Sequence, residues 1–166
     1  MVKYGIDYEI EKVKQLLMRS LKWPEIDLHG RVYKNPSKDA NGAVPEVYTS
    51  AQEYKEVLTD DLRNGLVFFS DSEKHVLKGL EMEADVAIIF ILNLSKLKGD
   101  ITRRDIDVQH EVLEVLLKQK IFEFSELTTG LGALKEFDTS QIQLSNMQPW
   151  HIFSITGKIK YNINNC

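Results

Sequence analysis

The sequence predicts a single α+β domain in which a mixed or mainly antiparallel sheet is backed by two main helices. Three patterns lead to this fold class: a helical repeat of apolar residues near the N-terminus, an apolar run from Ala84 to Leu94, and strict apolar–polar alternation near the C-terminus. The chain has 166 residues, of which 43% are hydrophobic and 28% charged. Such a chain can bury a real core, so we expect one domain over residues 1–166.

The N-terminal segment is expected to be an amphipathic helix, because its apolar residues recur at steps of three and four. Pro24 should end this helix, since the residue before a proline resists the α conformation. Residues 26–32 alternate between apolar and polar, which is typical of a half-buried strand. The apolar positions of the helix are Ile6, Ile10, Val13, Leu17 and Leu21.

A polar surface loop is expected from Asn35 to Ala43, because this stretch is rich in turn-forming residues. Its Asn41–Gly42 pair could close a hairpin onto residues 44–48. Residues 50–53 match a helix capping box, so we expect a short helix through Leu58. Residues 66–69 are expected to form a strand. The loop residues that we single out as an assembly surface are Asn35, Pro36, Asp39, Asn41 and Gly42.

The second half of the chain supplies the centre of the predicted sheet. Ala84 to Leu94 is nearly all apolar, which predicts a central strand with both faces covered. A second long helix is expected from about Arg103 to Lys118, capped by Thr102 and Asp105, and another strand around Phe122 and Phe124. Residues 153–163 alternate strictly and predict a long closing strand whose polar face meets solvent or a partner. The second helix should bury Ile106, Val112, Leu113, Leu116 and Leu117.

Composition narrows the classes of function. A net charge of −4 argues against broad binding to nucleic-acid phosphates, and we expect no sequence-specific nucleic-acid partner. The most apolar run, Val86 to Leu94, is too short to span a bilayer, and no signal peptide is visible. The one cysteine, Cys166, permits no intramolecular disulfide. A cytoplasmic protein without a membrane partner is therefore expected.

No pattern in the sequence calls for a cofactor or a metal. None of the four histidines stands at metal-ligand spacing from another histidine or cysteine. Asp107, His110 and Glu114 share one helix face, which the polar side of an amphipathic helix also explains. The lone Gly130-Leu131-Gly132 is interpreted as a loop or turn. Glu53-Tyr54-Lys55 resembles a nuclease acid-x-Lys pair, but the predicted helix would displace it from the strand that such a site needs.

The segment Met147-Gln148-Pro149-Trp150 combines a methionine, a proline and a tryptophan immediately before the closing strand. Amphipathic anchors of this kind recur at the centres of protein interfaces. We therefore single out Met147, Gln148, Pro149 and Trp150 as a second assembly surface.

The order of these elements resembles that of the tail terminator, or tail completion, proteins of tailed phages and prophages. The likeness rests on Tyr33-Lys34-Asn35-Pro36 before a polar loop, and on Met147-Gln148-Pro149-Trp150 before the closing strand. It also includes Phe153-Ser154-Ile155 and Lys158-Ile159-Lys160-Tyr161 in that strand, and it extends over most of the chain. The resemblance implies a structural protein rather than an enzyme. It implies a homo-oligomeric ring, commonly hexameric, that contacts the tail tube and the head connector, in the host cytoplasm or in the virion.

Two other classes of function stay open at this point. A monomeric or dimeric binding module with an unrelated partner would show one discrete groove. An enzyme would need a pocket where several of His29, His75, His110 and His151 converge with acidic side chains.

Overall fold

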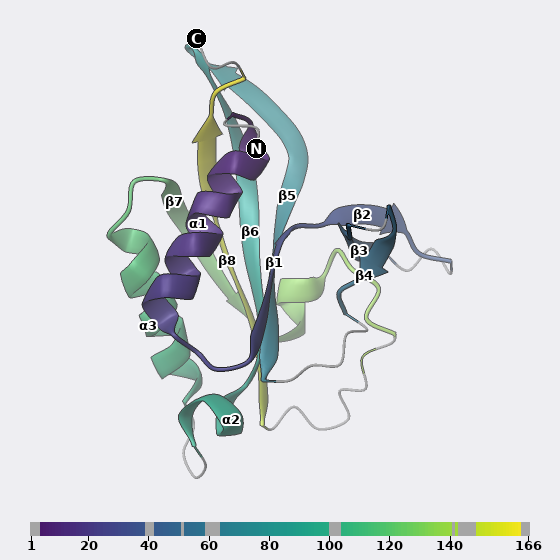
Figure 1. Ribbon diagram of the computed structural model, residues 1–166, viewed down its shortest axis with the longest axis vertical. Helices are drawn as coiled ribbons and strands as arrows, with labels where there is room; N and C mark the ends of the chain where they lie inside the picture. Colours follow the sequence, from purple (N-terminus) through teal and green to yellow (C-terminus); the bar gives the residue numbers. More distant parts are fainter. Residues whose placement is uncertain are drawn as a thin grey trace.

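A five-stranded mixed sheet forms the centre of the molecule, with strand order β1-β5-β6-β8-β7 (Figure 1). The computed structural model describes residues 4–38, 42–50, 52–58, 64–99, 104–140, 142 and 149–163. The β1–β5 pair is parallel and the other three pairs are antiparallel. In sheet order the strands are Ile26–Arg31, Gly65–Lys78, Glu81–Asn93, Trp150–Tyr161 and Phe122–Thr129.

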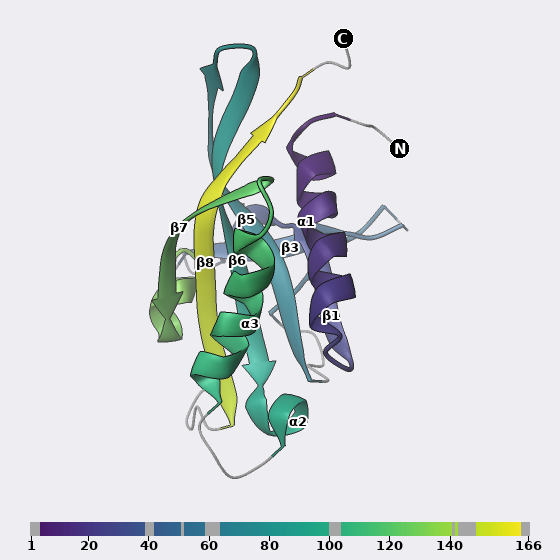
Figure 2. The same cartoon turned by 90° about the vertical axis from the view of Figure 1, so that its left-hand side faces the viewer.

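Two helices, α1 (Ile6–Leu21) and α3 (Asp105–Leu117), pack on one face of this sheet (Figure 2). The predicted apolar stripe of α1 is confirmed, since Ile6, Ile10, Val13 and Leu17 are all buried. A short helix, α2 (Leu94–Lys98), follows β6. The predicted fold class is thus confirmed: one compact α+β domain with a mixed sheet and two main helices.

The buried face of α3 differs from the expected one. Ile106 and Leu117 were predicted to be buried, but they are 52% and 63% exposed. The helix instead turns Val108, Val112 and Leu116 toward the sheet, because these three residues lie on a single stripe at steps of four. Ile106 and Leu117 lie off that stripe, so the prediction is confirmed for Val112 and Leu116, in part for Leu113, which is half-buried against the core, and is wrong for the other two residues.

A second, three-stranded antiparallel sheet lies on the other side of the molecule, in the order β2 (Tyr33–Pro36), β3 (Ala43–Tyr48) and β4 (Tyr54–Glu56). A hairpin onto residues 44–48 is confirmed, but Pro36 pairs with Ala43, so the connection is longer than the predicted Asn41–Gly42 pair. However, Asn35 and Pro36 belong to β2, so the connection covers residues 37–42 rather than the whole predicted loop. With the 3₁₀ segment η1 (Gly130–Leu134), this sheet closes a second core whose members include Val57, Phe68, Ile89 and Phe137.

The helix predicted after residue 50 is wrong, because residues 54–56 form the strand β4. Pairing with β3 overrides the capping signal: Val57 N donates to Pro45 O at 2.9 Å, and the Val57 side chain is fully buried. Lys55 is therefore on a strand, so the expected helix is not what separates the Glu53–Lys55 pair from a nuclease-type site. Both side chains are exposed at the edge of the small sheet.

The central strand and the closing strand are confirmed as β6 and β8, which pair along their whole shared length. Phe153, Ile155 and Ile159 of β8 face the helices, as the alternation predicts. On the other face Lys158 and Lys160 are exposed, but Ser154 is 5% exposed, because the η1 segment packs against this end of β8. The polar face predicted to meet solvent or a partner is therefore covered over part of its length.

None of the helices in the described ranges is long and apolar enough to cross a membrane.

Candidate functional site

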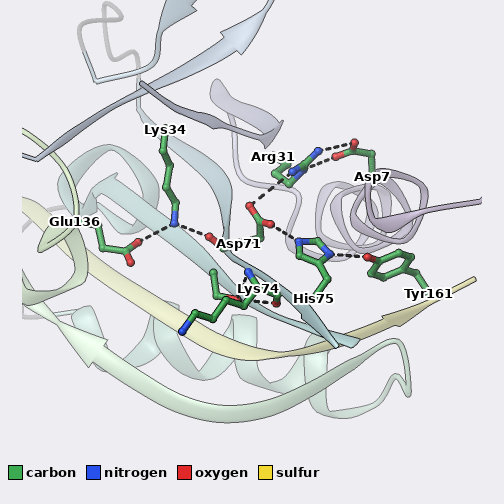
Figure 3. A network of polar contacts seen from close by, with 9 residues as sticks. Asp7, Arg31, Lys34, Asp71, Lys74, His75, Glu136 and Tyr161 are labelled. Atoms are coloured by element: carbon green, nitrogen blue, oxygen red, sulfur yellow. Dashed lines mark hydrogen bonds and ion pairs between the residues drawn. The ribbon is translucent and has the colours of Figure 1, made fainter. Parts of the chain in front are cut away.

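A network of polar side chains lies on the helix side of the main sheet, near the N-terminal end of α1 (Figure 3). Asp71 of β5 is at its centre and is only 4% exposed. His75 Nε2 is 2.7 Å from Asp71 Oδ2, and His75 Nδ1 is 2.5 Å from the Tyr161 hydroxyl. Arg31 Nη1 lies 3.7 Å from Asp71 Oδ1, and the same guanidinium donates two hydrogen bonds to Asp7 at 2.7 and 2.9 Å. We call these five residues the polar network.

An irregularity in β5 allows Asp71 and His75 to contact each other. Asp71 pairs with Val86 and His75 with Ala84, so β5 uses four steps where β6 uses two. Two additional residues leave the alternation of faces unchanged, and both side chains therefore point to the helix side. Glu73, inside the bulge, adopts a left-handed φ of 61°.

The electrostatics of the polar network favour a neutral phenol. Burial and the nearby Asp71 carboxylate raise the pKa of Tyr161, while Arg31 opposes this effect. The protonated Tyr161 hydroxyl can donate a hydrogen bond to Nδ1 of His75. The Nε2–H group of His75 then donates to the Asp71 carboxylate. The hydrogen bonds and the charge of Asp7 raise the pKa of Arg31. The hydrogen bonds and ion pairs of the polar network thus join α1, β1, β5 and β8.

The order carboxylate–imidazole–hydroxyl also occurs in nucleophilic active sites. In such sites the nucleophile is activated, whereas the pKa of Tyr161 is raised.

The four histidines are on different elements: His29 in β1, His75 in β5, His110 on an exposed position of α3, and His151 in β8. His151 contacts Gln109 at 2.9 Å and stacks on Phe153. Within the described ranges, no group of three or more His, Cys, Asp or Glu side chains is arranged to hold a metal ion.

The distal part of the β5–β6 hairpin projects beyond the rest of the sheet (Figure 1). We call residues 75–84 the hairpin arm. The pairing of β1 with β5 ends at Phe69, so no strand of the described chain covers the outer edge of β5 in the arm. Leu77 is 64% exposed and Leu80, in the two-residue turn, is 94% exposed. Large apolar side chains held this far into solvent are typical of surfaces that meet another molecule.

The outer face of the small sheet carries three tyrosines, Tyr33, Tyr48 and Tyr54. Their rings pack edge to face, with centroids 5.2 Å apart for Tyr33–Tyr54 and 5.6 Å for Tyr48–Tyr54. About half of each side chain is exposed. Strand register places Glu46 and Glu56 on the same face, since Tyr33 pairs with Glu46 and Glu46 with Glu56. We call these five residues the tyrosine face; exposed tyrosines supply much of the contact area in protein interfaces.

The acidic side chains of the tyrosine face repel one another. Burial, followed by the charges of Glu46 and Asp138, raises the pKa of Glu56. A group with a raised folded-state pKa contributes stability that is complete below its ordinary pKa of 4.5 and is lost as pH rises through the folded-state value. Ionised Glu56 therefore destabilises the fold at neutral pH.

Replacing Glu56 with glutamine is accordingly expected to stabilise the protein at neutral pH, by no more than about 0.5 kcal/mol because the site is partly solvated. The gain should vanish at acidic pH, where wild-type Glu56 is protonated. Urea unfolding of both proteins at the two pH values measures this difference. An equal gain at both pH values would assign the effect to the amide itself rather than to the removed charge.

A pocket of about 280 Å³ opens between the C-terminal half of α1 and the strands β1, β5 and β6. Its floor is buried, and the Trp23 ring at its side packs edge to face on Phe90 at 6.4 Å. The Trp23 indole also donates to Glu111 at 2.9 Å, which holds the ring in place. We call this hollow the α1 pocket. It is lined by Lys14, Gln15, Leu17, Met18, Leu21, Lys22, Trp23, Ile26, Leu28, Val67 and Phe90.

The structure separates the residues singled out from the sequence into several places. Asn35 and Pro36 are exposed on β2, where Asn35 donates to Glu46 at 2.7 Å beside the tyrosines. Gly42 is exposed, with a φ of 120°, and its carbonyl accepts from Ser37 N. Trp150 is half-buried against the second core, and the Pro149 carbonyl accepts from Leu94 N at 2.9 Å. The remaining positions, Asp39, Asn41, Met147 and Gln148, lie outside the described residues.

Sequence reasoning missed the polar network, the hairpin arm and the α1 pocket. The network joins residues up to 86 positions apart, such as His75 and Tyr161, and no local pattern reports such a contact. For the arm a signal was present, because Lys78-Gly79-Leu80-Glu81 can form a two-residue hairpin turn with glycine first. Gly79 does adopt a φ of 66° in that turn.

Comparison with known proteins identifies no relative: no protein-family model matches the sequence, and no curated protein matches it.

Proposed function

We propose that the chain is a structural assembly protein of a phage-like tail, which associates with copies of itself into a closed ring as tail terminators do. The hairpin arm is the observation that carries this proposal. Its exposed Leu77 and Leu80 extend from the body of the domain, where a partner could cover them. β8 pairs with Met82, Glu83 and Ala84 on one side of the arm, so the turn and the outer edge of β5 are the parts that a partner would cover.

The arm is better suited to side-chain contacts than to strand addition. Lys78 lies on the β5 strand of the arm, and Lys74 and the bulge between Asp71 and His75, which interrupts the regular ladder, lie immediately before it. Charged edges and bulges are the features by which proteins block edge-to-edge aggregation. Association through the apolar tip can therefore close into a defined oligomer, whereas pairing along the edge would favour open-ended stacking.

In the proposed role, the ring contacts the tail tube and the head-connector proteins, in the host cytoplasm or in the virion. The role is structural, and it requires neither catalysis nor a cofactor. The tyrosine face and the exposed β2 residues Asn35 and Pro36 lie on a different sheet from the arm. This separation leaves the tyrosine face available to partners other than the chain itself.

We expect the purified protein to form oligomers whose mass increases with concentration to a fixed multiple of the 19.1 kDa subunit. Light scattering coupled to size-exclusion chromatography, from low micromolar to near-millimolar protein, measures that mass, and electron microscopy shows whether the particles are closed rings. A strict monomer over the whole range, which also fails to co-sediment with tail tubes of the phage or prophage that encodes it, would contradict the proposed function.

A second candidate function is a non-catalytic binding module, which the tyrosine face favours. A module of this kind would stay monomeric or dimeric and bind one unrelated protein through Tyr33, Tyr48 and Tyr54. The same light-scattering series separates the two candidates. The mass of a binding module stops increasing at one or two subunits, whereas the mass of a ring increases to a larger fixed number of subunits.

A further inference from the structure

The turn of the hairpin arm presents a large apolar side chain, that of Leu80, to solvent. Leu80 is the most exposed large apolar side chain in the described ranges, at 94%. The turn that carries it has two residues, Gly79 and Leu80, between the paired Lys78 and Glu81. So short a loop restricts the backbone at Leu80, and little backbone entropy is therefore lost when the side chain becomes buried in a partner.

The α1 pocket is a matching receptor for an aliphatic side chain. Leu17, Val67 and Phe90 form a floor that is at most 1% exposed, and more exposed side chains, among them Met18 and Lys22, form its rim. Its volume of about 280 Å³ falls just below the range of roughly 300–1,000 Å³ that is usual for small-molecule sites. A leucine side chain with its neighbouring backbone suits this space better than an extended ligand does.

Charges beside the two features are complementary. Lys14 and Lys22 line the α1 pocket, and Lys22 is exposed just after the last turn of α1. Glu81 follows Leu80 directly and is exposed at the start of β6. Lys14 is 3.5 Å from the Glu11 carboxylate, so Lys22 is the cation that Glu81 would meet. Lys78 pairs with Glu81 across the turn, so this contact requires the Glu81 side of the turn to face Lys22 and the Lys78 side to face away. Charge pairs of this kind at the rim of an interface mainly fix orientation and register.

The arm and the pocket cannot meet within one molecule. The arm is at the upper end of the long axis in Figure 1, whereas the C-terminal turn of α1, which lines the pocket, is in the lower half. A donor and a receptor on different surfaces of one chain generate a heterologous contact between copies. Repetition of that contact gives a ring when the rotation between subunits closes.

We infer that Leu80 of one copy inserts into the α1 pocket of the next copy, with Glu81 facing Lys22. This inference rests on the proposed self-assembly and names its interface. The second copy is the occupant that the apolar fit, the pocket size and the paired charges together favour.

Cross-linking tests the contact directly. In a Cys166→Ser background, one chain carries Leu80→Cys and another carries Met18→Cys, a half-exposed residue of the pocket. We expect mild oxidation to give a disulfide-linked heterodimer only when the two variants are mixed. Efficient cross-linking of Leu80→Cys with itself would place two tips together and overturn the inference, as would the lack of any mixed product at concentrations where the parent protein is oligomeric.

A charge exchange tests the orientation. Glu81→Lys and Lys22→Glu should each weaken self-association, and the double variant should recover most of the loss because the pair is restored with reversed signs. Leu80→Asp should weaken association about 30-fold or more, as expected for an interface hot spot. Leu131→Asp, at a half-exposed leucine of η1, is the matched control and should leave association unchanged. Circular dichroism verifies that each variant is folded.

The possible results separate this inference from the proposed function. If the wild type forms rings and the Leu80→Asp variant still forms them, the arm–pocket contact is refuted and the proposed ring is kept. A closed dimer that shows the mixed cross-link would keep the contact, exchanged reciprocally between two copies, and refute the ring. A wild-type chain that is monomeric throughout would refute the arm–pocket contact, and one that also fails to co-sediment with tail tubes would refute the proposed function as well.

Discussion

Replacing Asp71 with alanine is expected to lower the free energy of unfolding by about 3 kcal/mol. The Asp71 side chain is nearly fully buried and is the carboxylate that His75 Nε2 and Arg31 Nη1 both approach. Alanine would leave the His75 donor without its acceptor and would leave Arg31 with Asp7 alone. Removing a buried carboxylate costs more than its contacts contribute, because the partly buried His75 and Arg31 side chains lose the group that compensates for their desolvation.

Chemical denaturation of wild type and variant measures this loss. Glu114→Ala is the matched control, since Glu114 also forms a 2.8 Å ion pair, with Lys118, but two thirds of each side chain is exposed. An exposed pair of this kind contributes little to stability, because water and salt screen its charges. If Asp71→Ala cost no more than the control, the polar network would be a surface feature without a structural role.

A double-mutant cycle of Asp71→Ala and His75→Ala shows whether the network acts as a unit. The two residues are in direct contact, so their effects should be non-additive by roughly 1 kcal/mol or more. Additive losses would mean that Asp71 acts through Arg31 rather than through His75.

The helical and strand patterns of the core could be predicted, because the periodicity reflects which face is buried. Ile10, Val13 and Leu17 recur at helical steps since α1 buries one stripe, and β6 is apolar from Val86 to Leu92 since both of its faces are covered there. These patterns depend on local sequence alone.

The strand β4 could not be predicted from the same kind of pattern. Residues 50–53 carry a helix capping signal, yet the turn before β4 is closed by Thr49, whose backbone N–H and hydroxyl both donate to Glu53 O. Burial of Val57 and Leu58 in the second core then outweighs the small local preference for a helix. Pairing with β3 and burial in the second core determine that this segment forms a strand. Neither contact can be recognised from the sequence of the segment alone.

The candidate surfaces depend on distant contacts to different degrees. The tyrosines of the tyrosine face are separated by up to 21 positions in sequence, as for Tyr33 and Tyr54, and are brought together only by the register of β2, β3 and β4. The α1 pocket requires a helix, three strands and their spacing at once. Leu80 required only the recognition of a turn, so it was the one part of the proposed interface within reach of local sequence reasoning.

Replacing Gly157 with alanine is expected to destabilise the protein by about 2–3 kcal/mol, at the upper end for an overpacked core site. Gly157 lies in β8 between Val86 of β6 and Phe124 of β7. A methyl group at this position would come 2.5 Å from the backbone carbonyl oxygen of Glu123 and 2.5 Å from the ring of Phe122. Neither can move easily, because Glu123 is held in the β7–β8 ladder and Phe122 is buried.

Gly30→Ala provides the matched control, because it is also a glycine in a strand of the main sheet but has no atom within 4 Å of the added methyl group. There the smaller chain entropy of unfolded alanine should make the change neutral or slightly stabilising. Thermal or urea unfolding of the two variants compares them directly. Equal stability of Gly157→Ala and Gly30→Ala would mean that β7 can shift away from β8 at low cost. The β7 edge would then be a mobile part of the sheet rather than a rigid support for the closing strand.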